Sequence, residues 1–367
     1  MTRAAELALL SIAMSVFADI GGAQEMGWGF NGGVTAISLH PRDSQPEGDQ
    51  TLSADLYLQH RGRNGNWFVY VEGNSSLDTD AASTILIEAN ADAGTALDPD
   101  RSGRIQISEI NYRTELGDGA FLTIGLLDAS GYLDRTRITN DENVQFLGAS
   151  FVNNPTIAFP DYTVSMVYER PAEGVRPQVN AVLASANGLA DNPNLSYSQL
   201  LRLTDDNDGA FAAIGLGWPS ERHLIRVGAW VNTRPHGSLD GSRDDATNYG
   251  AYAVYGRSWH NHGLNVRIGL ANEELVEGAQ FASIAYRFRW RQHALGAGIA
   301  RTYLSPAIDD LNRDDSTQLE LFGRFNLTPT IHFTVSIQRL IHSGLVSAAS
   351  DPRESARLVG ARFHVSF

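Results

Sequence analysis

The sequence contains no cysteine and no lysine, because all 28 basic residues are arginine. Without lysine, a P-loop lysine, a Schiff-base lysine and a Ser-Lys dyad are all excluded. Without cysteine there is neither a thiol nucleophile nor a disulfide framework. The metalloprotease motif H-E-x-x-H and the nucleophile motif G-x-S-x-G are also missing. We therefore expect no catalytic residues, no metal and no cofactor.

The charge balance and the hydropathy exclude two further classes of protein. The formal net charge is −14 at pH 7, which argues against nucleic acid as a partner because nucleic acid requires a basic surface. Beyond the first residues, no stretch of about 18 apolar residues could form a membrane-spanning helix. The chain is 43% hydrophobic with a mean hydropathy of −0.21. That composition fits a soluble protein, and it equally fits a transmembrane β-barrel whose strands have one wet face.

The first 23 residues have the pattern of a secretory signal peptide. Arg3 gives a positive start, Leu7 to Ala18 is apolar, and Gly21-Gly22-Ala23 offers small residues before a cleavage site. A buried N-terminal helix is the alternative. An exported chain without cysteine or a spanning helix is expected in the periplasm or outer membrane of a Gram-negative bacterium. Residues 24–367 then form a single domain.

Apolar and polar residues alternate strictly at the C-terminus. Val359, Ala361, Phe363, Val365 and Phe367 share one face of an extended segment, because successive side chains of a strand point to opposite sides. A final strand with an aromatic last residue is typical of outer-membrane β-barrels that close on their N-terminal strand. A half-buried strand of a soluble sheet shows the same alternation.

Similar segments recur along most of the chain. Thr330 to Ile341 is the clearest, and Tyr162, Val164, Met166 and Tyr168 are expected on one outer face. We count about sixteen such runs between Leu56 and Phe367, which predicts an all-β fold: a transmembrane antiparallel up-and-down barrel of about 16 strands.

The connections between these runs alternate in length. Long links such as His342 to Glu354 alternate with short ones such as Leu327 to Thr330. This rhythm is typical of outer-membrane barrels, with long extracellular loops and short periplasmic turns. Trp218, Trp259 and Trp290 all flank short turns, as an interfacial aromatic girdle requires. Packing in a soluble core is the alternative for these tryptophans.

Several blocks of sequence resemble the carbohydrate-selective porins of the OprB family. The blocks are Ile124 to Asp128 with Ala129-Ser130-Gly131-Tyr132, Asn140-Asp141-Glu142, Gln145-Phe146-Leu147, Phe151 to Thr156, Ile225 to Trp230, and Val359 to Phe363. The similarity extends from about Ile107 to Phe367. It departs from the family in a shorter chain and in an opening reduced to Gly27-Trp28-Gly29. The resemblance implies an outer-membrane channel that admits sugars by passive diffusion, without a cofactor.

If the apolar faces meet lipid, the opposite faces line water. The predicted pore-lining residues are Arg226, Trp230, Arg267, Arg287, Arg289, Glu320 and Arg324. Arginine offers several fixed donors to sugar hydroxyls, and an aromatic ring matches the C–H face of a pyranose. A loop folded inward should form the constriction, and the best candidate is Asp128 to Gln145, with Tyr132, Asp134, Arg135, Arg137 and Glu142. Alternatively, these charges pair with one another and only brace the wall.

Three other functions share parts of this pattern: a general non-selective porin, an outer-membrane barrel enzyme, and a structural barrel with a plugged lumen. The expected partners are outer-membrane lipid, lipopolysaccharide and small sugars, with the chain acting as a monomer or a homotrimer. The acidic segment from Asp309 to Asp315 is a candidate for divalent ions that bridge lipopolysaccharide.

Overall fold

A computed structural model describes residues 27–42, 46–93, 103–189, 197–202 and 208–367. The predicted signal peptide, residues 1–23, lies outside these ranges. Within them, no helix is long and apolar enough to cross a membrane.

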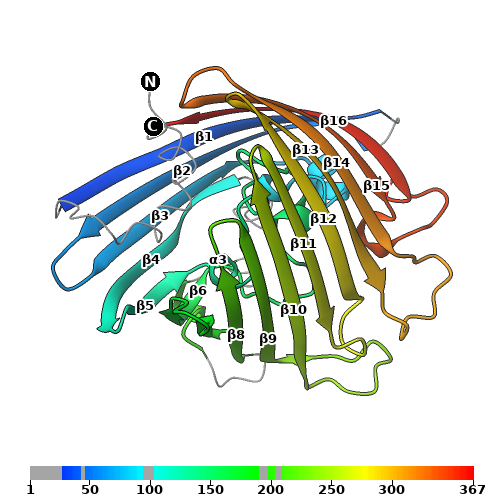
Figure 1. Cartoon of the computed structure of the whole chain (residues 1–367). Coiled ribbons are helices and arrows are strands. Elements are labelled where there is room, and N and C mark those ends of the chain that lie inside the picture. Colours follow the sequence, from blue (N-terminus) through cyan, green and yellow to red (C-terminus); the bar gives the residue numbers. More distant parts are fainter. Residues whose placement is uncertain (1–26, 43–45, 94–102, 190–196, 203–207) are drawn as a thin grey trace.

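Sixteen antiparallel strands form one closed barrel, in which each strand pairs with its neighbours in sequence and β16 pairs with β1 (Figure 1). Val34 lies opposite Val365, and Leu39 lies opposite Gly360. The strands are β1 (Gly27–Pro41), β2 (Asp49–Arg61), β3 (Asn66–Ser75), β4 (Gly103–Gly117), β5 (Ala120–Leu127), β6 (Thr163–Arg170), β7 (Gln178–Ser185), β8 (Ala210–Pro219), β9 (His223–His236), β10 (Ala246–Trp259), β11 (His262–Ala271), β12 (Gly278–Trp290), β13 (His293–Leu304), β14 (Ser316–Asn326), β15 (Ile331–Ile341) and β16 (Ser355–Ser366).

The predicted fold class is confirmed, and so is the strand number, but the positions of the first strands were wrong. β1 and the start of β2 precede Leu56, where we predicted no strand. The region around Gly32 and Gly33 weakens the alternation, because glycine contributes no side chain to either face.

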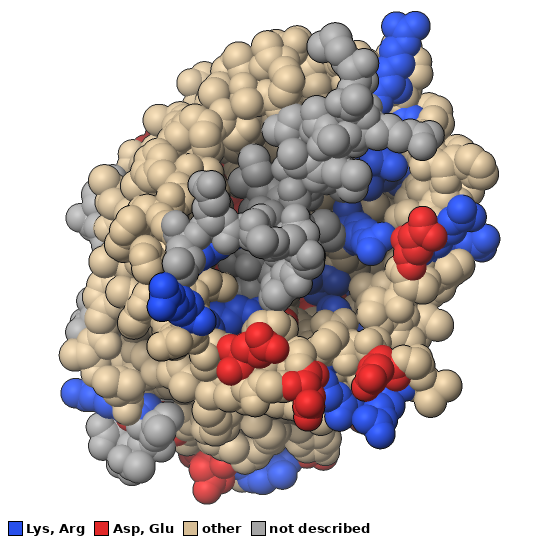
Figure 2. All heavy atoms as spheres, turned by 60° about the vertical axis from the view of Figure 1, so that its left-hand side comes forward, with Lys and Arg blue, Asp and Glu red and all other residues tan. Residues whose placement is uncertain are grey.

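Alternation along each strand separates an apolar exterior from a polar interior. On β15, Phe333, Val335 and Ile337 are exposed on the outside, whereas Thr334 and Ser336 are buried on the inside. An exposed apolar band on the outer wall is what a barrel surrounded by hydrocarbon requires. In the view of Figure 2, most of the outer surface is uncharged, and charged side chains gather at the rim and around the hollow.

One face assignment was wrong. The ring of Tyr162, predicted on the outside, lies 6.1 Å from the ring of Tyr70, whose hydroxyl donates to the inward-facing Asp55. Tyr162 precedes the first residue of β6 and has a positive φ of 36°. The alternation of β6 therefore does not extend to it.

Five of the six tryptophans gather at the end of the barrel that carries the short turns. Trp28, Trp67, Trp218 and Trp290 are all exposed on the outer wall, and Trp259 is the last residue of β10. Indole rings prefer the membrane–water interface, where the apolar ring and the polar N–H are both accommodated. This belt sets the level of one membrane surface.

Two of the long connections fold inward. The first joins β5 to β6 and carries α3 (Ser130–Leu133) and α4 (Ala149–Val152), and Figure 1 shows α3 inside the ring of strands. The second joins β3 to β4 and carries α2 (Ala82–Ile85) and the 3-10 turn η1 (Ala91–Ala93). Two more 3-10 turns, η2 (Tyr197–Gln199) and η3 (Ser343–Leu345), lie in other long loops. Buried apolar clusters lie between the inward loops and the wall: Leu133 and Ile157 against Val167 and Trp230, and Leu86 against Ile37 and Leu358.

Candidate functional site

The loop between β5 and β6, here called the inner loop (residues 128–162), is held against the barrel wall by a buried ion pair. Arg267 on β11 places Nη1 2.6 Å from Oδ2 of Asp134, and both side chains have no exposed surface. Arg267 also donates to the backbone carbonyls of Phe151 and Val152. Oδ2 of Asp134 accepts from the backbone N–H of Asn154, at 2.8 Å. Burial raises the pKa of Asp134, and the neighbouring Arg267 opposes that rise.

Four more arginines of the wall donate to backbone carbonyls of the inner loop. Arg226 reaches the carbonyl of Leu133 at 2.8 Å, Arg287 that of Arg137 at 3.2 Å, and Arg324 that of Val144 at 2.8 Å. Arg362 on β16 donates to the carbonyls of Glu142 and Gln145. Together with Arg267, these residues form a row of cations from β9 to β16, here called the arginine row. Its members hold the loop through main-chain atoms.

A carboxylate fixes the middle of the inner loop. Glu320 on β14, which is 1% exposed, accepts from the backbone N–H of Leu147 at 2.9 Å and of Gly148 at 2.8 Å. Glycines on the wall leave room for the inner loop to lie close to the strands. A Cβ on Gly298 would lie 2.6 Å from the ring of Phe151, and one on Gly269 would lie 2.0 Å from Oγ1 of Thr156.

The opposite wall carries carboxylates and tyrosines. Asp55 on β2 and Glu72 on β3 point inward, and Asp55 accepts from the hydroxyl of Tyr70 at 2.6 Å. The ring of Tyr57 stacks on that of Tyr70, with centroids 4.8 Å apart. We call Asp55, Tyr57, Tyr70 and Glu72 the acid–tyrosine wall. Because arginines line one side of the lumen and carboxylates the other, a field runs across the channel.

The predicted pore-lining residues all lie on inner faces, but the inner loop covers them unequally. Arg267, Glu320 and Trp230 are 0%, 1% and 3% exposed, so they contact the loop and not the open lumen. Arg226 and Arg287 are also buried, whereas Arg289 and Arg324 are half-buried.

The predicted constriction-loop residues divide in the same way. Tyr132 and Asp134 are buried against the wall, Arg135 and Glu142 are half-buried, and Arg137 is exposed. Burial and the neighbouring Asp141 and Asp92 raise the pKa of Glu142. The polar surface that a solute can reach is therefore made mainly by Arg135, Arg137, Glu142, Arg289 and Arg324.

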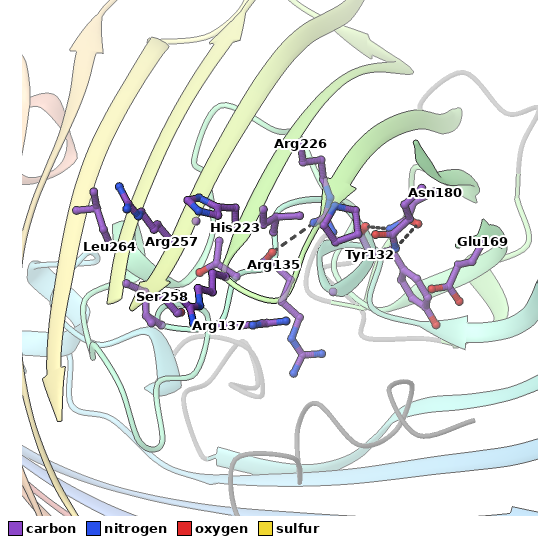
Figure 3. Close-up of a pocket in the computed structure, with 18 residues that line it drawn as sticks. Tyr132, Arg135, Arg137, Glu169, Asn180, His223, Arg226, Arg257, Ser258 and Leu264 are labelled. Carbon is purple, nitrogen blue, oxygen red and sulfur yellow. Dashed lines mark hydrogen bonds between the residues drawn. The ribbon is translucent and has the colours of Figure 1, made fainter. Parts of the chain in front are cut away.

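A cavity of about 320 Å³ lies between the first part of the inner loop and the wall (Figure 3). Tyr132, Arg135 and Arg137 line it from the loop, and Glu169, Asn180 and Arg226 from strands. Asn180 donates to the carbonyl of Tyr132, and Glu169 pairs with Arg113 at 2.5 Å. Polar side chains from both the loop and the strands therefore border this cavity.

Sequence reasoning missed Arg362, the acid–tyrosine wall and the second inward loop. Arg362, Asp55 and Glu72 occupy inward positions of their strands, so the alternation could have found them. The second loop gives no such signal. Its Glu88 accepts from the hydroxyls of Ser316 at 2.7 Å and of Ser343, and Gln338 donates to the carbonyl of Ala89 at 2.9 Å.

Asp92 of the second loop should make the stability depend on pH. Burial, reinforced by the nearby Asp55, raises its pKa to about 7 from 3.8. The folded state therefore binds this proton more tightly than the unfolded state, and stability falls as pH rises between these two values. Thermal unfolding in detergent at pH 5 and pH 8 should show a smaller difference for Asp92→Asn than for the wild type. Equal differences would refute this assignment.

No family model matches this sequence, and no curated protein matches it. Solved structures do. The high-pH structure of OprB from Pseudomonas putida has a TM-score of 0.68 at 11% identity, covering 93% of this chain and 94% of that chain. The fold is that of an outer-membrane porin. A loop-deletion mutant of OmpT, an outer membrane protein of Vibrio cholerae, has a TM-score of 0.58 at 13% identity, covering 94% and 100%. A mutant of the Rh. blastica porin has a TM-score of 0.54 at 10% identity, covering 93% and 100%.

Identities this low establish the shared fold and nothing finer. With its apolar exterior and aromatic belt, this porin-type barrel belongs in the bacterial outer membrane. The long loops then lie on the extracellular side and the short turns on the periplasmic side.

Proposed function

We propose that this protein is a channel for the passive diffusion of small polar solutes, and of sugars in particular. The observation that supports this most is the inner loop, which narrows a closed barrel without abolishing the polar space beside it. A sugar needs donors, acceptors and flat apolar surfaces, and the inner loop and the walls together supply all three.

The side chains that face the lumen suit a pyranose ring. Guanidinium groups donate two hydrogen bonds in one plane, which matches vicinal hydroxyls. The half-buried carboxyl group of Glu142 can accept from hydroxyls, and the half-buried rings of Tyr57 and Tyr70 offer faces for the C–H side of the sugar. Such contacts are individually weak, so that a solute can also leave, as conduction requires.

A general porin would use the same fold, with the field across the lumen sorting solutes by charge and dipole. A plugged barrel would use the two inward loops as a permanent closure. Both alternatives make different predictions for transport, and they are outcomes of the experiment below. Whether the chain acts as a monomer or a homotrimer stays a prediction.

Swelling of proteoliposomes tests the proposal. We expect swelling in isosmotic solutions of monosaccharides, and open-channel current in planar bilayers that falls on titration with the same sugars. Current without a sugar effect would favour the general porin. The absence of both current and swelling would favour the plugged barrel and overturn the proposal.

Arg324→Ala should alter selectivity more than stability. The side chain is half-buried and uses one guanidinium nitrogen on the carbonyl of Val144, leaving other donors toward the lumen. We expect the reversal potential to shift toward cation preference, because a positive charge is lost from the lumen, together with a weaker block by sugar. Lost folding with unchanged permeability would contradict the placement of Arg324 at the channel.

A further inference from the structure

Arg226 on β9 brings a buried positive charge to the cavity shown in Figure 3. The residue is 8% exposed. A guanidinium group has five N–H donors, and among the described residues only Nη1 of Arg226 makes hydrogen bonds, to the carbonyls of Leu133 and Arg135. Burial of a charge costs free energy unless the charge is paired. The cavity therefore adjoins a cation that can still bind an anion.

The carboxylates near Arg226 are already bound to other arginines. Asp134 and Glu169 both interact electrostatically with Arg226. However, Asp134 pairs with Arg267 at 2.6 Å, and Glu169 pairs with Arg113 at 2.5 Å. Among the described residues, Glu169 is the only carboxylate that lines the cavity. Within the same part of the chain, Arg226 makes no ion pair of its own.

A second cation lines the cavity from the inner loop. Arg137 is exposed, and its Nη1 donates to the carbonyl of Glu221, in the short turn after β8, at 3.0 Å. This contact places the cavity at the end of the barrel with the short turns, which is the periplasmic end. Positive charges around a hollow with low-dielectric walls raise the local concentration of anions.

The remaining lining suits a carbon skeleton that carries hydroxyl groups. Gln178 donates through Nε2 to Asn180 at 3.1 Å, and its Oε1 accepts no hydrogen bond from the described residues. Ile138 and Leu224 add apolar surface, and Tyr132 adds an aromatic ring. The volume of about 320 Å³ is at the lower end of the range for ligand pockets, about 300–1,000 Å³. A small hydroxylated anion matches this size and this lining.

We propose that this cavity binds carboxylated sugars, such as uronates, on their way through the channel. The inference rests on the proposed function and names a substrate class for it. A carboxylate accepts paired hydrogen bonds from a guanidinium fork, and Nε and Nη2 of Arg226 form such a fork. The carbon skeleton lies against the apolar side chains, and a hydroxyl donates to Gln178. A single carboxylate held by few groups can also leave, as conduction requires.

Current block in planar bilayers tests this proposal on the full-length protein, with glucuronate and glucose as the probes. The two solutes share a ring and differ in one carboxylate, so the ratio of their half-blocking concentrations reports on the anion site. We expect glucuronate to block at about a tenfold lower concentration than glucose, as one charge-assisted pair of hydrogen bonds provides. Glucuronamide, which has the same shape without the charge, should block like glucose.

Variants separate the anion site from the position of the inner loop. Arg226→Met should reduce the tenfold preference to about one. Movement of the loop would change the block by both solutes, whereas loss of the anion site changes their ratio. Arg137→Gln should reduce the preference less, about threefold, because an exposed charge contributes less.

Two further variants test the space and the specificity of the effect. A Cβ on Gly131, which lines the cavity, would meet no atom within 4 Å, so Gly131→Leu should partly fill the cavity and weaken the block by glucuronate. The matched control is Arg176→Gln, which changes an exposed arginine between β6 and β7 that does not line the cavity. It should leave the preference unchanged.

The possible failures are distinguishable. A channel that glucose and glucuronate block equally would overturn this inference and leave the proposed function intact. A preference that persists in Arg226→Met would also overturn it. Stronger block by glucose 6-phosphate than by glucuronate would refute the carboxylate class in favour of phosphate esters. Absence of current would refute the inference and the proposed function together.

Discussion

Replacing Arg267 by methionine should release the inner loop from β11 and widen the channel. The substitution leaves Asp134 buried without its partner and removes the donors to Phe151 and Val152. Breaking a fully buried ion pair costs about 3–5 kcal/mol. We expect a higher single-channel conductance, faster swelling with larger sugars and a lower temperature of unfolding.

The response of this variant to pH gives a sharper test. Burial already raises the pKa of Asp134, and loss of the adjacent cation should raise it further. A protonated Asp134 is cheaper to bury, so the variant should recover stability as the pH falls. Arg243→Met is the control, since it breaks an ion pair with Glu274 that is half-exposed on an outer loop and contributes little. Unchanged conductance in Arg267→Met would show that the ion pair does not hold the loop in place.

Replacing Glu320 by alanine should release the middle of the inner loop. Two backbone N–H groups, of Leu147 and Gly148, would lose a buried acceptor. Each unsatisfied buried donor costs about 1–3 kcal/mol. We expect lower thermal stability and a noisier, larger current, because the segment before α4 would no longer be fixed to β14.

Glu320→Gln separates charge from hydrogen bonding. Its amide oxygen in the place of Oε2 can still accept from the N–H groups of both Leu147 and Gly148, but its amide nitrogen replaces the second acceptor of the Leu147 N–H with a donor. Its effect should therefore lie between the wild type and Glu320→Ala. If Glu320→Gln and Glu320→Ala behave alike in unfolding and in current, the N–H groups of Leu147 and Gly148 do not depend on this acceptor.

The barrel was predictable because its environment imposes a simple rule on each strand. Lipid outside and water inside select alternate apolar and polar residues, as on β15. β1 was not predicted as a strand because its inner face is partly apolar: Ile37 and Leu39 pack against Leu86 of the second inward loop. Where a loop covers the lumen side, the rule that marks a strand no longer holds.

The site was less predictable, because it depends on where a loop lies. Inward positions such as Arg267, Trp230 and Glu320 followed from alternation, but the extent to which each is covered did not. The inner loop makes most of these contacts through its own backbone carbonyls and N–H groups, which every residue possesses. Nothing in the sequence distinguishes Leu133 or Val144 as an acceptor for arginine.

Because main-chain atoms hold the inner loop in place, the residues that line the lumen are not the atoms that anchor the loop. Side chains of the inner loop that project into the lumen, such as Arg135 and Arg137, can be exchanged while the carbonyls that Arg226 and Arg287 grip remain available. Descendants of one barrel can thus acquire new permeants by altering a few inward residues, with no need to evolve a new way of anchoring the segment that bears them.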